Sequence, residues 1–333
     1  MVGRRNMTIQ QTPSSYGVSK AFLDALDNLA QKPSWWRDVL LRDDVFIAVR
    51  ANSLNVYHRG ASIFRIDDGG DGRLIPWTHT KYLIRQQQVL AQLHHDGHFQ
   101  PSDIGWSQYA GPSTLSDMIR SATDLAGAEK SGLHPLIVGS SKVIDVELSL
   151  LRANSSIDES LADTDAHSAG APPIDRSQDR LDVVTVENRG GKPFIVFHEA
   201  KHFSNAALRA KGEPAVLAQI VRYQTTLRQH DATLRQRYVA VCQALVRLHT
   251  MRTAARAAFP ASRPLLEPDP LIAAVASGQV QAEIDADPRL IVFGFDGDQR
   301  DGRWERDAKR LRDYQPALKI RAIGNTRSAR DFF

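Results

Sequence analysis

The sequence predicts an α/β fold in which helices flank a central mixed β-sheet. Runs rich in β-branched and apolar residues recur in the second half of the 333-residue chain, at residues 142–150, 180–187 and 193–198. Two segments with apolar side chains at helical spacing follow them, residues 213–229 and 231–258. Because strand-like and helical segments alternate, the pattern is typical of a sheet covered by helices.

The C-terminal end continues this pattern. Residues 290–295 form a continuous apolar run, which predicts a buried strand. Residues 303–314 have helical spacing, and residues 318–323 predict a last strand. A strand, a helix and a second strand at this spacing predict a right-handed crossover between parallel strands.

Residues 1–130 predict a separate α+β region that serves recognition or oligomerisation. Residues 17–42 are helical in pattern, and residues 78–96 predict another helix that ends in a group of histidines. Between them lie three short β-rich runs, as in an antiparallel meander: residues 45–49, 54–58 and 62–66. Residues 131–333 form the predicted core, with a flexible acidic insertion at 153–178.

The composition excludes several classes of protein. Hydrophobic residues make up 42% and charged residues 24%, and no apolar run could span a bilayer, so we expect neither a membrane protein nor a disordered chain. No secretory signal precedes the first helix, which predicts a cytoplasmic protein without a membrane partner. The single cysteine, Cys242, excludes an intrachain disulfide and a cysteine-based zinc site.

The net charge of +4 conceals two segments of opposite sign. The insertion at 153–178 is acidic, whereas residues 201–256 contain ten basic and only two acidic residues. A basic block of this kind predicts binding to the phosphate backbone of a nucleic acid through counterion release.

The residues that carry chemistry lie in two neighbouring strand candidates. Asp182 lies in the first, and Glu199 and Lys201 lie at the end of the second. Gly190 and Gly191 between them predict a hairpin turn. Residues two apart in a strand point to the same face, so the carboxylate of Glu199 and the ammonium of Lys201 should project together, with Asp182 beside them.

These residue types suit metal-assisted hydrolysis. Two carboxylates and the carbonyl of Ala200 are the hard oxygen ligands that Mg²⁺ prefers, and Mn²⁺ could substitute for it. A bound ion of this kind neutralises a scissile phosphate and acidifies a water molecule. Lys201 could position that water or stabilise the charge that develops on the phosphate. The set therefore predicts in-line hydrolysis of a phosphodiester.

The order of these motifs resembles the PD-(D/E)xK nuclease superfamily, which has the restriction-endonuclease-like fold. Asp182 and Glu199-Ala200-Lys201 are similar to its acid, hairpin and Glu-x-Lys signature. Gln219 and Tyr223, four residues apart on the next predicted helix, look like the Gln-x-x-x-Tyr motif of the branch related to RecB and Cas4 nucleases.

The resemblance implies a role for each residue. Asp182 and Glu199 would hold the metal with the Ala200 carbonyl, and Lys201 would be the catalytic lysine. Further residues would act beside them: Glu147 as an upstream acid, with Asp145 as its substitute, and Gln219, Tyr223 and Arg222 as groups that bind nucleic acid or position the site. The implied function is Mg²⁺-dependent cleavage of nucleic acid, DNA rather than RNA, in restriction, phage defence or repair, by a protein that could form a homodimer.

Two alternatives use the same residues. His198-Glu199-Ala200-Lys201-His202 is literally H-E-x-x-H, which on a helix would bind Zn²⁺ as in a metalloprotease. The apolar run 194–197 behind the glycine turn favours a strand instead, on which the two histidines could not chelate one ion. The second alternative is a catalytically inactive nuclease fold that only binds nucleic acid.

Overall fold

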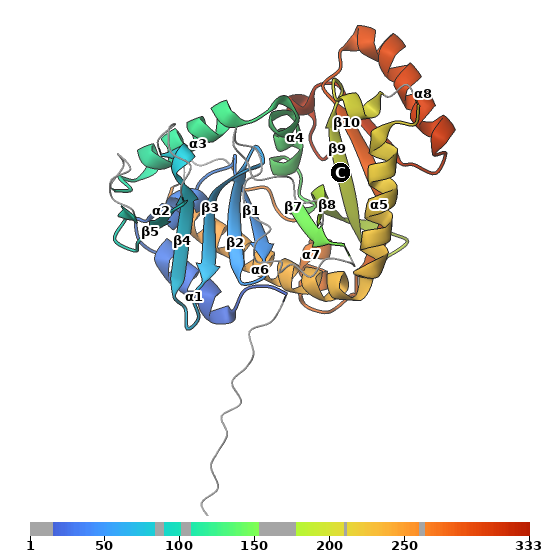
Figure 1. Ribbon diagram of the computed structural model, residues 1–333. Helices are drawn as coiled ribbons and strands as arrows, with labels where there is room; N and C mark the ends of the chain where they lie inside the picture. Colours follow the sequence, from blue (N-terminus) through green and yellow to red (C-terminus); the bar gives the residue numbers. More distant parts are fainter. Residues whose placement is uncertain (1–15, 84–89, 101–107, 153–177, 210–211, 260–263) are drawn as a thin grey trace, which may run out of the picture.

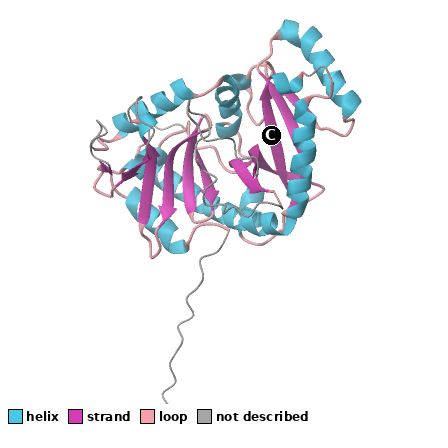
Figure 2. Cartoon of the chain, viewed as in Figure 1, coloured by secondary structure: helices cyan, strands magenta, loops and turns pink. Residues whose placement is uncertain are grey.

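The protein contains two β-sheets that lie next to each other, with helices packed around them (Figure 1). This computed structural model describes residues 16–83, 90–100, 108–152, 178–209, 212–259 and 264–333. Most of the predicted acidic insertion at 153–178 lies outside these ranges. The architecture confirms the α/β class, and Figure 2 shows that strands of both sheets are flanked by helices.

The N-terminal sheet has six antiparallel strands in sequential order: β1 (Phe46–Arg50), β2 (Ser53–His58), β3 (Ala61–Asp68), β4 (Leu74–His79), β5 (Leu90–Leu93) and β6 (Phe99–Gln100). Three helices pack beside it: α1 (Lys20–Ala30), α2 (Trp35–Leu40) and α3 (Pro112–Leu125). The first helix begins at Ser19, whose hydroxyl accepts a hydrogen bond from the backbone N–H of Phe22. This N-cap satisfies a donor that the first helical turn cannot pair.

The helix predicted at 78–96 is wrong. Residues 74–79 form β4, a short 3-10 turn follows at Thr80–Tyr82, and residues 90–93 pair with β4 as β5. Residues 84–89 lie outside the described residues. The histidines belong to a turn in which the N–H of His94 donates to the carbonyl of His98, and Gly97 adopts a φ of 89°. Pairing with a neighbouring strand overrode the helical spacing of a few apolar residues.

The second sheet has five strands in the order β11-β10-β9-β8-β7. Its strands are β7 (Val143–Leu151), β8 (Gln178–Arg189), β9 (Lys192–His202), β10 (Glu283–Phe293) and β11 (Ile320–Ile323). β7, β8 and β9 form an antiparallel meander, whereas β10 runs parallel to both β9 and β11. The predicted mixed sheet, with a parallel crossover at its C-terminal end, is therefore confirmed. The β8–β9 turn contains Gly190 and Gly191 at φ 59° and 86°, a conformation that glycine adopts at little cost.

Helices cover both faces of this sheet. They are α4 (Ala128–Val138), α5 (Ala215–Gln229), α6 (Asp231–Ala257), α7 (Pro270–Ala276) and α8 (Glu305–Tyr314), with a π-helical turn at Gln299–Trp304 and 3-10 turns at Ala206–Leu208 and Thr326–Ser328. α5 and α8 share a core with Val292, whereas α4 shares another with Phe293. Because successive residues of a strand point to opposite faces, the two cores lie on opposite sides of the sheet.

The two sheets are joined by a shared core and a buried ion pair. The largest hydrophobic cluster runs from α1 through the first sheet to α6 and β10. At the junction, Nη1 of Arg50 lies 2.5 Å from Oδ1 of Asp145 on β7, whose side chain has no exposed surface. Within the described residues, no helix is both long and apolar enough to cross a membrane.

Replacing Arg50 by methionine should lower the free energy of unfolding by about 3 kcal/mol, because it leaves the buried carboxylate of Asp145 without its closest cation. Urea denaturation would measure this change. The double variant Arg50→Met/Asp145→Asn should recover much of the loss. The matched control Arg65→Met removes a partly exposed partner of Asp67 and should cost less than about 1 kcal/mol. Equal losses in the two single variants would contradict this role of the junction pair.

Candidate active site

The carboxylate of Asp182 is fixed where two strands stop pairing. The β8–β9 ladder runs from Arg189–Lys192 to Val183–His198. Just beyond it, Oδ2 of Asp182 accepts a hydrogen bond from the backbone N–H of Ala200 at 2.8 Å. A side chain thus takes the place of a backbone partner, which holds Asp182 against the strand that carries the Glu-x-Lys motif.

Glu199 and Lys201 project together from β9, as predicted from their spacing. Nζ of Lys201 donates to Oε1 of Glu199. The same oxygen accepts from Nε2 of Gln219 on α5 at 2.9 Å. The other oxygen of Glu199, Oε2, is buried and has no hydrogen-bond partner among the described residues. An unpaired buried oxygen of this kind is costly unless a ligand uses it.

Glu147 lies beside Asp182 in a strained conformation. In β7, Val146 pairs with Val183 and Leu148 with Leu181, so Glu147 is in register with Asp182. Its φ is 52°, in the left-handed region that side chains of L-residues seldom adopt within a strand. Backbone strain of this kind costs on the order of 1–3 kcal/mol and persists only where the surroundings enforce it.

A lysine that the sequence analysis did not single out joins the two carboxylates. Nζ of Lys130, on α4, lies 2.5 Å from Oε1 of Glu147 and 2.7 Å from Oδ1 of Asp182. Its neighbour Glu129 accepts hydrogen bonds from the backbone N–H of His202 and the side-chain amide of Asn205. The first turn of α4 therefore contributes two residues to the site.

The charges of this cluster shift the pKa values of two of its carboxyl groups in opposite directions. The pKa of Glu199 is raised to about 8, because the side chain is buried and lies near the charge of Asp182, and the lysines oppose this only in part. Burial alone would raise the pKa of Asp182, but the charges of Lys130 and Lys201 outweigh it, so this pKa is lowered. The pKa values of Glu199 and Asp182 are thus shifted in opposite directions, a division typical of catalytic carboxylates.

Gln219 and Tyr223 lie side by side on α5, as their spacing predicts. Nε2 of Gln219 donates to the hydroxyl of Tyr223 at 2.5 Å, and this hydroxyl donates to the carbonyl of Arg180 at 2.5 Å. Tyr223 is buried, which raises the pKa of its hydroxyl. Gln219 thus touches the site directly, whereas Tyr223 ties α5 to β8.

Arg222, on the same helix, is held by a different carboxylate. Its Nε lies 2.8 Å from Oδ1 of Asp179, which also accepts from Arg152, and the other Asp179 oxygen accepts from the hydroxyl of Thr226. The side chain of Arg222 keeps 43% of its surface exposed. Its predicted contact with nucleic acid would have to be made by that exposed part.

The donor set at the centre of the cluster fits Mg²⁺. Within the described ranges, no group of three or more His, Cys, Asp or Glu side chains is arranged around one point, because Lys130 and Lys201 lie between the acids. Mg²⁺ does not need such a group, since one or two carboxylates and several waters satisfy it. Asp182 and Glu199 are near each other, and Oε2 of Glu199 lacks a partner among the described residues.

The zinc-binding interpretation lacks its structural basis. His198 and His202 lie on the extended strand β9, not on a helix. The ring of His198 is completely buried, with Nε2 2.9 Å from the hydroxyl of Thr185, and burial lowers its pKa to about 3. His202 instead interacts with Ser204 and with the ring of Phe293. Zinc-binding geometry of the H-E-x-x-H type requires a helical turn between the histidines.

Comparison with known proteins gives no match for this chain. No protein-family model matches it, and neither does any curated protein or solved structure.

Replacing Lys130 by methionine should lower the free energy of unfolding by about 3 kcal/mol in chelator, because Glu147 and Asp182 lose their shared cation. Millimolar Mg²⁺ should then raise the melting temperature of the variant more than that of the wild type, since an ion can replace the ammonium. Differential scanning fluorimetry would measure both effects.

The matched control for this substitution is Lys192→Met, at the opposite end of β9. The side chain of Lys192 is 71% exposed, and its removal should change stability by no more than about 0.5 kcal/mol. The shared role of Lys130 would be refuted if both variants responded to Mg²⁺ as the wild type does.

Proposed function

We propose that the protein is a metal-dependent nuclease that hydrolyses phosphodiester bonds, with DNA as its substrate. The observation that carries this proposal is the convergence of Asp182, Glu199 and Lys201 in one buried cluster, with Gln219 bonded to Glu199. These are the residues that the resemblance to PD-(D/E)xK nucleases assigns to the active site.

The connectivity of the second sheet also supports the proposal. The chain passes from β8, which carries Asp182, through a glycine turn to β9, which carries the Glu-x-Lys motif. It then forms α5, with Gln219 and Tyr223, and returns as β10, which runs parallel to β9. This order agrees with a restriction-endonuclease-like core. Glu147, the upstream acid that the resemblance implies, lies on β7 opposite Asp182 on β8.

Asp182 and Glu199 would hold the metal, which when bound supplies charge neutralisation at a scissile phosphate and an acidified water. Gln219 orients the Glu199 carboxylate through Oε1 and leaves Oε2 free for the ligand. Burial alone would lower the pKa of Lys201, but the charges of Glu199 and Asp182 outweigh it, so this pKa is raised. The ammonium of Lys201 therefore stays protonated and can contact a phosphate oxygen. Lys130 keeps Glu147 and Asp182 close together by neutralising their mutual repulsion.

The basic block at 201–256 supports the proposal less than its sequence implies. Seven of its arginines lie within 4.0 Å of an aspartate carboxylate: Arg209, Arg222, Arg228, Arg235, Arg237, Arg247 and Arg256. Most of their partners come from distant parts of the chain, such as Asp24 and Asp307, whereas Arg235 pairs with Asp231 within the block. Most of the positive charge counted in this block is therefore already balanced within the protein.

One observation favours a second candidate, a nuclease-like fold that binds nucleic acid without cleaving it. Lys130 satisfies one oxygen each of Glu147 and Asp182, and the N–H of Ala200 satisfies the other oxygen of Asp182. The site can thus balance its charge without a metal. Binding of an oligonucleotide in fluorescence anisotropy, without cleavage on gels, would favour this candidate.

The isosteric variants Asp182→Asn, Glu199→Gln and Lys201→Met should each reduce cleavage at least about 100-fold, because each removes a group that acts on the metal or the phosphate. Supercoiled plasmid, linear duplex, single-stranded DNA and RNA, each with Mg²⁺, Mn²⁺ or chelator, would be analysed on gels. DNA should be cleaved in preference to RNA.

Glu283→Gln, on β10 and away from the cluster, serves as the matched control and should cleave as the wild type does. Near-ultraviolet circular dichroism would establish that each variant is folded. Cleavage that persists in chelator, or in Asp182→Asn at the rate of the control, would falsify the proposal.

A further inference from the structure

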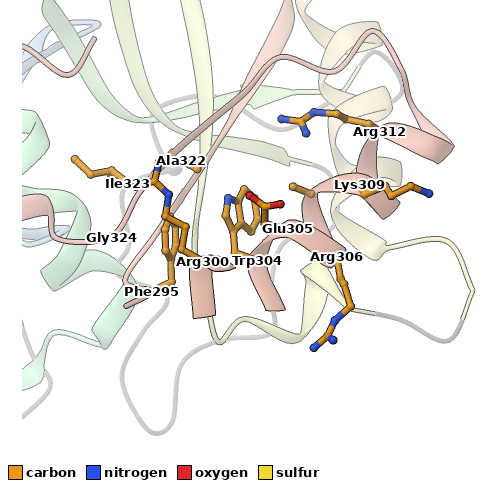
Figure 3. A pocket seen from close by; sticks show the side chains of 11 residues that line it. Phe295, Arg300, Trp304, Glu305, Arg306, Lys309, Arg312, Ala322, Ile323 and Gly324 are labelled. Carbon is orange, nitrogen blue, oxygen red and sulfur yellow. The ribbon is translucent and has the colours of Figure 1, made fainter. Parts of the chain in front are cut away.

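A cavity of about 580 Å³ lies beside the edge strand of the second sheet. Its walls are α8, the π-helical turn before it and the end of β11 with Gly324. Figure 3 shows the side chains that line this region, with Glu305 beside Trp304 and with Arg306 and Lys309 pointing away from the Trp304 ring. A cavity of several hundred Å³ is large enough for a ligand of one or two nucleotides rather than a single ion.

Four basic side chains and one acid line this cavity: Arg300, Arg306, Lys309, Arg312 and Glu305. Arg300, Arg306 and Arg312 are exposed, and none has a carboxylate within 4.0 Å in the described part of the chain. Lys309 lies 3.1 Å from Asp313, but both side chains remain largely in solvent. This charge differs from that of the 201–256 block, where seven of the eight arginines lie within 4.0 Å of an aspartate carboxylate.

The floor of the cavity is aromatic and fixed. The rings of Phe295 and Trp304 are stacked, with centroids 5.6 Å apart and an interplanar angle of 14°. Both residues are buried, and Phe203 packs edge-on against both rings. These buried rings hold the π-helical turn and the start of α8 against the sheet, so the backbone that carries the basic side chains is fixed.

The cavity lies at the same end of the sheet as the candidate active site. Lys201 pairs with Val292 and His202 with Phe293, and Phe295 follows directly on the chain. Phe203, two residues after Lys201, touches the floor of the cavity. Only β10 separates β9 from β11, so the lateral distance between these strands is roughly 10 Å.

We propose that this pocket binds the phosphodiester backbone of the substrate strand, next to the phosphate at the active site. This inference rests on the proposed nuclease function. Arginine presents a planar fork of donors that matches phosphate oxygens, and three arginines without carboxylate partners among the described residues line the pocket, Arg300 from the π-helical turn and Arg306 and Arg312 from α8. The pocket would hold the strand through its phosphates and would not read its bases.

The test is a triple variant, Arg306→Gln/Lys309→Gln/Arg312→Gln, compared with Lys20→Gln/Lys32→Gln/Arg120→Gln. The control removes the same charge from exposed positions in the N-terminal region. Fluorescence anisotropy with a labelled oligonucleotide in chelator, across a salt series, gives the affinity and its salt dependence. The pocket variant should bind roughly tenfold more weakly, with the slope of log K against log salt reduced by about 3.

Charge-conserving substitutions and a small competitor complete the test. Arg306→Lys/Arg312→Lys should keep the salt slope of the wild type, because the phosphate contacts remain. Millimolar mononucleotide or pyrophosphate should not displace the oligonucleotide from the wild type; displacement would identify a small-phosphate site and overturn the proposal.

The outcomes separate this proposal from the one on which it rests. If the wild type binds and cleaves, but the pocket variant matches the control in affinity and salt slope, the pocket proposal fails and the nuclease proposal stands. If the wild type neither binds nor cleaves any nucleic acid, both fail.

Discussion

The candidate active site depends on neutralising the negative charge of three carboxylates that the fold buries close together. Glu147, Asp182 and Glu199 are each no more than 7% exposed, and a buried charge costs several kcal/mol unless it is paired. Lys201 supplies one cation from within the sheet, Lys130 supplies another from α4, and Nε of Arg180 lies 3.5 Å from Oε2 of Glu147. The position of α4, the opening between β8 and β9 and the place of α5 are therefore all coupled to one electrostatic requirement.

The same requirement explains how charge is distributed elsewhere. The two long helices α5 and α6 are rich in arginine, yet most of their arginines pair with aspartates, among them Asp24 on α1, Asp179 on β8 and Asp287 on β10. These pairs fasten the helices to the two sheets and leave little free charge on them. In contrast, arginines that lack carboxylate partners within the described residues line the cavity beside α8. Unpaired positive charge therefore lies beside α8, and not in the 201–256 block that the number of basic residues in the sequence indicated.

Local spacing decided which features could be predicted. The strand identity of β9, the shared face of Glu199 and Lys201 and the pairing of Gln219 with Tyr223 follow from residues two to four positions apart. Lys130 is 52 positions from Asp182, and no periodicity links them. The erroneous helix at 78–96 has the same origin, because β5 is a strand through its partner β4 and not through its own pattern. The features that could not be predicted, Lys130 and the strand β5, depend on contacts between residues distant in the sequence.

The costs that remain in the structure are concentrated in one place. Three costs occur within the same cluster: Glu147 has a left-handed backbone within a strand, one buried oxygen of Glu199 has no partner in the described chain, and burial raises the pKa of the Glu199 carboxyl group. A cluster that served only stability would be better replaced by apolar side chains, since buried ion pairs are often no more stable than hydrophobic residues of similar size. Local violations of this kind are typical of sites that act on a ligand. The arrangement therefore supports a working site more strongly than a structural one, and a cation at Glu199 would remove two of the three costs together.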